Sequence, residues 1–250
     1  MNTLTLVTGK GGVGKTRTSL LLAEADSRAC LTETAPGLQE EAQNLGLKPK
    51  PILRFERSDL YEDFLASALK FPPLAKWLMK APLFHSLLQL APNLQELLTF
   101  SKWLELAEEQ PLVVDAPATG HFLAYFQAIH AARNIFDGGT LKALADRAHK
   151  YLDSAESIEI VIVALPEHSA LEEMKQIEEG VLKLYPHLKI RRILNRLHLK
   201  PETTLALPPN LKLLAEERPK REQQRAQDFN RPFEKVIAFG DRALSKASPS

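Results

Sequence analysis

Short apolar runs and segments of helical periodicity alternate along most of the chain. A short apolar run that ends at a glycine, a proline or a charged residue predicts a buried strand. The runs of this kind span residues 4–8, 29–34, 52–55, 112–115, 158–165 and 190–195. Helical spacing of apolar residues predicts helices between several of these runs, at 16–24, at 122–153 with a turn at 137–139, and at 170–184. This alternation predicts an α/β fold with a mostly parallel sheet and helices on both of its faces.

The pattern changes between the third and fourth predicted strands. Apolar residues recur at helical spacing from Leu60 to Leu106, and prolines at 72, 73, 82 and 92 divide this region into short helices. We therefore expect a small helical layer, in which residues 57–107 form a helical subdomain or insertion within a single domain spanning 1–250. Near the end of the chain we expect one helix at 221–231 and another at 232–243.

A glycine-rich loop lies between the first predicted strand and the first predicted helix. Residues 9–16 read GKGGVGKT, which fits the phosphate-loop pattern G-x-x-x-x-G-K-[ST] in its proper strand–loop–helix context. Glycines let backbone N–H groups curl around an anion, and the helix that follows presents the positive end of its dipole. The pattern predicts a P-loop nucleotide site, in which Lys15 reaches the β- and γ-phosphates and the Thr16 hydroxyl binds Mg²⁺. The residues expected to bind the nucleotide here are Gly9, Gly11, Gly12, Val13, Gly14, Lys15, Thr16 and Arg17.

Lys10 is a second lysine in this loop, directly after its first glycine, where an ordinary phosphate loop needs none. The stretch KGGVGKT resembles the deviant Walker A loop of a group of dimeric ATPases. In that group the early lysine crosses the dimer interface to the phosphates of the facing subunit, where a cation stabilises the charge of the transition state. The resemblance implies ATP as ligand, a nucleotide-dependent homodimer and a catalytic role for Lys10. The alternative is a solvated surface lysine.

Residues 113–123, VVDAPATGHFL, narrow this resemblance. They are similar to the D-T-A-P-T-G-H stretch of the ArsA-type ATPases, a family of arsenite-pump subunits and targeting factors for tail-anchored membrane proteins. The resemblance implies that Asp115 supports Mg²⁺ through water and that the backbone N–H of Gly120 meets the γ-phosphate. Further along, ILNR at 193–196 resembles the family's V-x-N-R, whose asparagine reads adenine, and this implies the same role for Asn195.

The chain departs from this family after its second predicted strand. The family carries Asp-Pro there and its aspartate orients the attacking water, whereas this chain has Ala35 before the proline. Glu33 lies two residues earlier on the same strand face. It takes over the catalytic positioning of water, binds Mg²⁺ indirectly, or is a carboxylate satisfied locally at the strand end. Two functions therefore stay open. One is an ATPase, with slow turnover, that drives a dimer switch, and the other is a nucleotide-sensing protein-binding module with little or no hydrolysis.

The composition limits the classes of partner that the chain is expected to bind. A net charge of +1 predicts binding to neither nucleic acid nor an anionic membrane surface. No apolar run reaches the roughly 20 residues of a membrane helix, and the first residues lack the pattern of a signal peptide, so we expect a cytoplasmic protein without an integral membrane segment. Cys30 is the single cysteine, which argues against an arsenite site or a zinc-clamped dimer. The aromatic residues of 57–107 either bind an unidentified protein client or pack on the domain and its dimer partner.

Overall fold

A computed structural model describes most of the chain. The described residues are 4–25, 29–32, 38–47, 52–55, 57–80, 93–154, 157–198, 209–229, 231–233 and 235–238. The strands are β1 (Leu4–Gly9), β2 (Ala29–Thr32), β3 (Ile52–Leu53), β4 (Leu112–Asp115), β5 (Ile158–Ala164), β6 (Lys189–Leu197) and β7 (Lys235–Ala238). They form one seven-stranded sheet in the order β3-β2-β4-β1-β5-β6-β7, and each neighbouring pair is parallel.

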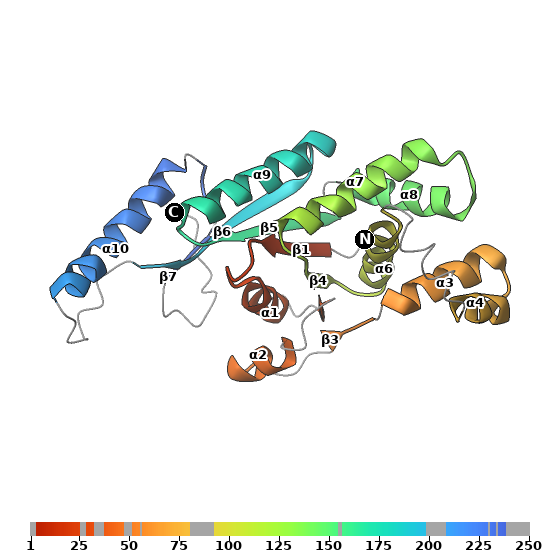
Figure 1. Cartoon of the computed structure of the whole chain (residues 1–250), viewed down its shortest axis with the longest axis horizontal. Coiled ribbons are helices and arrows are strands. Elements are labelled where there is room, and N and C mark those ends of the chain that lie inside the picture. Colours follow the sequence, from red (N-terminus) through yellow and green to blue (C-terminus); the bar gives the residue numbers. More distant parts are fainter. Residues whose placement is uncertain are drawn as a thin grey trace.

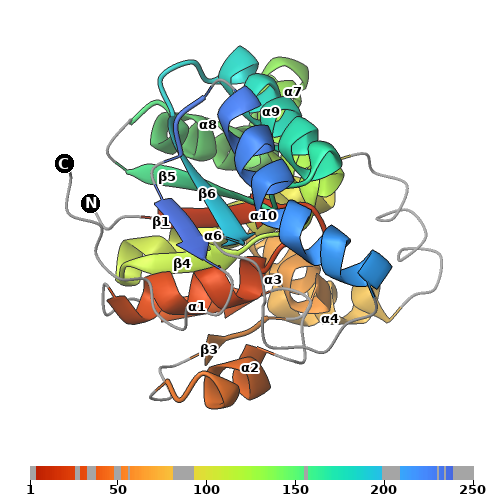
Figure 2. The same ribbon diagram turned by 90° about the vertical axis from the view of Figure 1, so that its left-hand side faces the viewer.

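Helices connect the strands and cover both faces of the sheet (Figure 1). They are α1 (Lys15–Ala25), α2 (Leu38–Asn44), α3 (Arg57–Leu69), α4 (Pro72–Met79), α6 (Leu94–Glu109), α7 (Thr119–Ile135), α8 (Gly139–Leu152), α9 (His168–Leu184) and α10 (Pro209–Asp228). Figure 2 shows α1 and α2 on one side of the sheet and α7, α8 and α9 on the other. The predicted fold class is therefore confirmed: the chain has the α/β architecture of the P-loop nucleoside triphosphatases.

The order of the strands brings the ends of β1 and β4 together. The chain leaves β1 through α1 toward one edge of the sheet, and after β4 it continues past β1 toward the other edge. Strand β1 therefore lies between β4 and β5, with Val7 level with Asp115 and Gly9 level with Val163. In an open parallel sheet, such a reversal of strand order leaves a crevice at the carboxyl ends of the strands, where ligands bind.

Core residues lie on both faces of the sheet, under α1 and α2 on one face and under the α6–α7–α9 layer on the other. All residues of β1 and β4 are buried, as expected for central strands covered on both faces. Helix α6 joins this layer through aromatic contacts with α7. The ring centroids of Trp103 and Tyr125 lie 4.7 Å apart, and those of Phe100 and Phe126 lie 6.0 Å apart. These contacts fix α7, whose first turn follows directly from the end of β4.

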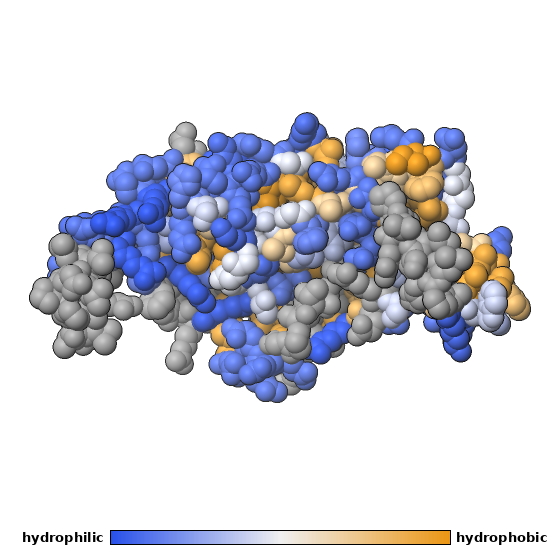
Figure 3. All heavy atoms as spheres, in the orientation of Figure 1, coloured by the Kyte–Doolittle hydropathy of each residue, from blue (hydrophilic) through white to orange (hydrophobic). Residues whose placement is uncertain are grey.

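Helices α3 and α4 lie side by side at one end of the molecule (Figure 1). Two aromatic side chains are exposed here, Phe71 at 56% and Trp77 at 65%, beside the exposed Leu69 and Leu74. Figure 3 shows hydrophobic residues gathered at the same end. The three helices α3, α4 and α6 lie in the region predicted to be a helical subdomain, and the division of 57–107 from the rest of the domain stays a prediction.

Near the C-terminus, the first predicted helix is present with other bounds, and the second prediction is wrong. Helix α10 begins at Pro209, well before the expected 221, and it ends at Asp228. The helix expected over 232–243 is absent from the described part, where Lys235–Ala238 form strand β7 against β6. The β-branched residues Val236 and Ile237 suit a strand, and pairing with the open edge of β6 outweighs the helical spacing of the segment. Residues 239–243 lie outside the described part.

Candidate functional site

The glycine-rich loop connects the end of β1 to the start of α1. Gly12 and Gly14 have φ angles of 80° and 93°, a region that side chains other than glycine rarely adopt. Gly9, with φ at 146°, leaves no room for a side chain, because an added Cβ would lie 2.1 Å from the carbonyl oxygen of Val163. The loop conformation therefore requires glycine at these three positions, and its backbone leads directly into the N-terminus of α1.

Thr16 and Asp115 meet where the loop enters the helix. The Thr16 hydroxyl donates a hydrogen bond of 2.7 Å to Oδ2 of Asp115, which ends β4. Ser19, one turn further along α1, places its hydroxyl 3.4 Å from the other carboxylate oxygen and 3.0 Å from the carbonyl oxygen of Lys15. The structure thus brings together the two predicted metal-binding residues. Ser19 was not predicted, although its position four residues after Lys15 places it on the same face of the helix.

Burial acts on the two opposite charges of this site. Asp115 is 7% exposed, and burial raises the pKa of its carboxyl group against the hydrogen bond from Thr16 and the charge of Lys15. Burial also lowers the pKa of the Lys15 ammonium, and the charges of Asp115 and Glu173 offset only part of this effect. A phosphate group would supply negative charge beside Lys15, and a divalent cation would supply positive charge beside Asp115. Hydroxyl and carboxylate oxygens are ligands that Mg²⁺ prefers, so the residues fit a magnesium nucleotide.

Lys10 is paired within its own chain. Its ammonium nitrogen lies 3.1 Å from Oε1 of Glu173 in α9, and the carbonyl oxygen of Lys10 accepts a hydrogen bond of 3.1 Å from the Lys15 ammonium. Oε2 of the same Glu173 accepts a hydrogen bond of 3.0 Å from the hydroxyl of Thr119. Neither Glu173 nor Thr119 was predicted, because no motif of the sequence points to a contact between α9 and the loop.

Gly120 lies in the first turn of α7, close to the loop. The connection before it is held to β1, because the N–H of Ala116 donates to the carbonyl oxygen of Val7 at 2.9 Å and the Thr8 hydroxyl donates to that of Pro117 at 2.9 Å. No atom lies within 4 Å of a Cβ added to Gly120, so the residue faces open space. Its contact with a γ-phosphate stays a prediction.

Asn195 lies against the loop from the neighbouring strand. It is 6% exposed, and its amide nitrogen donates a hydrogen bond of 2.8 Å to the carbonyl oxygen of Val13. That nitrogen also lies 2.5 Å from the position of a Cβ added to Gly14. Asn195 therefore packs directly on the phosphate loop, a contact that sequence reasoning missed. Its predicted contact with adenine stays a prediction.

The remaining predicted residues differ in exposure, and some of them lie outside the described part of the chain. Gly11 and Gly12 are exposed at the tip of the loop, and Arg17 is half-buried in the first turn of α1. Glu33 and Ala35, on which the water-positioning hypothesis depends, lie outside the described residues.

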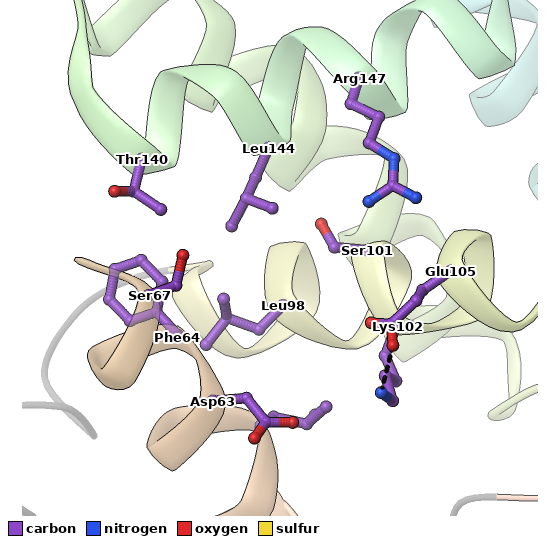
Figure 4. Close-up of a pocket in the computed structure, with 11 residues that line it drawn as sticks. Asp63, Phe64, Ser67, Leu98, Ser101, Lys102, Glu105, Thr140, Leu144 and Arg147 are labelled. Atoms are coloured by element: carbon purple, nitrogen blue, oxygen red, sulfur yellow. Dashed lines mark hydrogen bonds and ion pairs between the residues drawn. The ribbon is translucent and has the colours of Figure 1, made fainter. Parts of the chain in front are cut away.

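A separate cavity of about 190 Å³ lies among α3, α6 and α8 (Figure 4). Phe64, Leu98 and Leu144 give it an apolar interior, and Lys102 and Arg147 are among the charged residues at its edge. Both cations have acidic partners, Glu105 for Lys102 and Glu108 for Arg147. None of the residues predicted for the nucleotide lines this cavity, so it is distinct from the phosphate loop.

The described residues hold neither a metal cluster nor a membrane-spanning helix. No group of three or more His, Cys, Asp or Glu side chains there is placed to hold a metal ion. Among the helices that the structure describes, none combines the length and the apolar character needed to cross a membrane.

Comparison with known proteins gives distant relatives. No model of a protein family matches the chain. It is similar to ATPase BagA of Mycobacterium tuberculosis and to "Putative ATPase Mb3704" of Mycobacterium bovis. Each is 26% identical to this chain over 230 residues, a match that covers 80% of this chain and 67% of the relative. Both relatives are named as ATPases, and both names agree with the nucleotide site inferred from the loop.

Proposed function

We propose that this chain binds ATP with Mg²⁺ at residues 9–16 and hydrolyses it, as an ATPase of the ArsA type. The observation that carries the proposal is the contact between Thr16 and Asp115 beside the half-buried ammonium of Lys15. A turn that was merely rich in glycine would have no reason to place a lysine, a hydroxyl and a strand-end carboxylate at the start of one helix. The names of the relatives support the same activity.

Each residue of the loop has a defined task in this proposal. The backbone N–H groups of the loop and the N-terminus of α1 attract the phosphates, and Lys15 neutralises their charge. Thr16, through its hydroxyl oxygen, and Asp115, through its carboxylate, would hold the cation. Mg²⁺, when bound with ATP, stabilises negative charge on the phosphate oxygens. The backbone N–H of Gly120 meets the terminal phosphate, Arg17 adds a phosphate contact, and Asn195 reads the base.

We further propose that the active form is a homodimer that forms when ATP binds. Lys10 of each subunit then reaches the phosphates of the other, where a cation supplied in trans lowers the barrier to phosphoryl transfer. Residues 57–107 act as the helical subdomain, and the exposed side chains of Phe71 and Trp77 are candidates for contact with a protein client. The expected setting is the cytoplasm, without a role for nucleic acid.

Hydrolysis in this chain must use a residue other than the usual aspartate. Alanine stands at position 35 and cannot orient water, and we propose Glu33 for that role. A second function is a nucleotide-sensing module that binds a protein and hydrolyses little or no ATP. It is favoured by Ala35 and by the pairing of Lys10 with Glu173 inside one chain.

Phosphate release from purified protein separates the two functions. We expect turnover by the wild type, none by Lys15→Ala, and wild-type turnover by Lys175→Ala, a matched change at an exposed lysine of α9. Glu33→Gln should lose turnover and keep ATP affinity. Binding of MgATP without phosphate release would favour the sensing module, and no heat of binding for MgATP in calorimetry would exclude both functions.

A further inference from the structure

One carboxylate connects three segments around the phosphate loop. Glu173 uses Oε1 for the Lys10 ammonium at 3.1 Å and Oε2 for the Thr119 hydroxyl at 3.0 Å. Lys10 belongs to the loop, Thr119 is the first residue of α7, and Glu173 lies one turn into α9. We call this set of three residues the Glu173 bridge.

The carboxylate stands on a rigid support. Helix α9 buries a face that includes Ala170, Leu171, Met174 and Ile177, and it packs on α7 and on strands β1 and β5. Figure 1 shows α7 and α9 next to each other over the sheet. Glu173 itself is partly exposed, with 28% of its side chain accessible, and the long side chain of Lys10 is 38% accessible. The bridge can therefore open by a movement of Lys10 alone, without disturbing the core.

A bound triphosphate would compete with this bridge. The charge of Glu173 acts on Lys15, the residue expected to bind the β- and γ-phosphates, so the carboxylate lies within electrostatic range of the phosphate site. A polyanion bound there repels the carboxylate and attracts the ammonium of Lys10. Movement of α7 toward a terminal phosphate would at the same time pull Thr119 from Glu173.

We propose that Glu173 is a positioning residue that holds Lys10 inside its own subunit until ATP binds, and that it couples the release of Lys10 to the start of α7. The inference rests on the proposed function, because only an ATP-dependent dimer gives the released lysine a place to go. Ion pairs between partly exposed side chains contribute little to stability, so the bridge is weak enough for a nucleotide to open.

The first test needs no nucleotide. The acetylation rate of Lys10 by acetic anhydride, followed by mass spectrometry of the nucleotide-free protein, reports how firmly its ammonium is held. We expect Glu173→Gln to raise this rate by about two- to fivefold, the range that a partly exposed ion pair can supply. Glu172→Gln, which removes the same charge from an exposed neighbour on α9, should leave the rate unchanged. Equal melting temperatures of the two variants would show that the fold is intact.

The second test measures the dimer. Light scattering during titration with MgATP should show half-maximal dimer at about two- to fivefold lower ATP for Glu173→Gln than for the wild type. Thr119→Val, which keeps the shape of the side chain and removes its hydroxyl, should shift the midpoint in the same direction without changing the acetylation of Lys10 as strongly. Glu172→Gln should titrate as the wild type does.

The outcomes distinguish this inference from the function on which it rests. A wild type that gives no heat with MgATP in calorimetry would overturn the proposed function and the bridge with it. A wild type that binds MgATP and dimerises, with Glu173→Gln identical to Glu172→Gln in either test, would overturn the bridge alone. A faster acetylation of Lys10 together with a lower ATP midpoint, both specific to Glu173→Gln, would support it.

Discussion

The amide nitrogen of Asn195 donates a hydrogen bond to the carbonyl oxygen of Val13, a residue 182 positions earlier in the chain. This contact joins the end of β6 to the phosphate loop, and the close approach of the same nitrogen to Gly14 leaves no space between them. A side chain placed in this way supports the loop from inside the protein. If Asn195 supports the loop, removing its side chain should weaken the binding of any phosphate chain. If Asn195 contacts adenine, its removal should weaken the binding of ATP alone.

Asn195→Ala should therefore weaken binding of phosphate chains as well as of ATP. Loss of a buried hydrogen bond is expected to cost about 1–3 kcal/mol of stability and to loosen the loop. Calorimetry with MgATP and with magnesium tripolyphosphate, which carries no base, measures the two effects. Reduced affinity for both would support the loop role. Asn134→Ala, at an exposed position on α7, is the matched control and should bind both as the wild type does.

An outcome restricted to ATP would support the other role. If Asn195→Ala loses affinity for MgATP and keeps its affinity for magnesium tripolyphosphate, the side chain reads the base and its bond to Val13 contributes little to the loop.

Alanine should destabilise the protein strongly at position 9 and have little effect at position 11. An alanine at position 9 would place its Cβ against the backbone of Val163, in a conformation with φ at 146°, whereas no atom lies within 4 Å of a Cβ at position 11. We expect Gly9→Ala to lose about 3 kcal/mol of unfolding free energy, because backbone cannot move aside as a side chain can. Gly11→Ala should stay within about 1 kcal/mol of the wild type. Urea denaturation measures both, and equal stabilities would contradict the loop geometry.

The loop was predictable because its chemistry is local. Its glycines, Lys15 and Thr16 are contiguous, and the strand before and the helix after them are visible in the hydrophobic pattern. Strand β4 was also predicted at both ends, because its four-residue apolar run begins directly after Pro111 and ends on the charged Asp115. Sheet order then brought Asp115 to the loop, as expected for a strand that neighbours β1.

Contacts set by packing were not predictable. Glu173 reaches Lys10 only because of the position at which α9 packs along β5 and β1. Nothing in its own segment distinguishes it from Glu172. The same holds for Asn195, whose bond to Val13 depends on how β6 is placed beside β5. Strand β7 was mistaken for a helix because its four residues lack a pattern of their own and gain their conformation from the edge of β6.

Removing the charge of Lys15 should stabilise the protein without nucleotide. Burial lowers the pKa of Lys15 below its ordinary 10.5, so the folded state holds this proton less tightly than the unfolded state does. Between the two pKa values stability rises with pH, and below both the full cost of the buried charge is present. Lys15→Met should therefore melt at a higher temperature than the wild type near neutral pH, and the difference should shrink as the pH rises through the lowered pKa.

The same substitution should abolish binding of MgATP. Calorimetry and thermal melts on one preparation of Lys15→Met measure both effects. A lower melting temperature than that of the wild type at neutral pH would contradict the account of Lys15 as a charge held for a phosphate.

Removing the charge of Asp115 should also stabilise the protein without nucleotide. Burial raises the pKa of its carboxyl group above the ordinary 3.8, so the folded state holds a proton that the unfolded state has already lost. The free energy of unfolding then falls as the pH rises from the ordinary pKa to the raised one. Above the raised pKa the full cost of the buried charge is present. Asp115→Asn should be more stable than the wild type at neutral pH and equal to it in acid, as measured by thermal melts. Its affinity for ATP should also depend less on Mg²⁺ than that of the wild type, because Thr16 is then the only one of the two proposed metal-binding residues that keeps its oxygen ligand.

Neutralising Glu178 should destabilise the protein, because two arginines compensate the charge of its carboxylate. It is 4% exposed on α9, where it accepts a hydrogen bond of 2.6 Å from Arg192 of β6 and lies 2.9 Å from Arg231. Burial by itself would raise the pKa of Glu178, but the hydrogen bonds and charges of the two arginines outweigh it and lower the pKa below 4.5. This group therefore contributes stability above pH 4.5, and the contribution is lost as the pH falls through the lowered pKa.

Glu178→Gln should accordingly lose about 3 kcal/mol at neutral pH, because it removes the buried carboxylate that pairs with Arg192 and Arg231. Urea denaturation at a series of pH values should show the difference from the wild type narrowing in acid, where Glu178 is protonated in both states. Glu172→Gln, one helical turn and a half earlier and exposed, should follow the wild type throughout. Because Arg231 lies four residues before the start of β7, the loss should also expose the amides of β7 to faster hydrogen exchange. A difference that stayed constant with pH would show that the carboxylate acts by shape and not by charge.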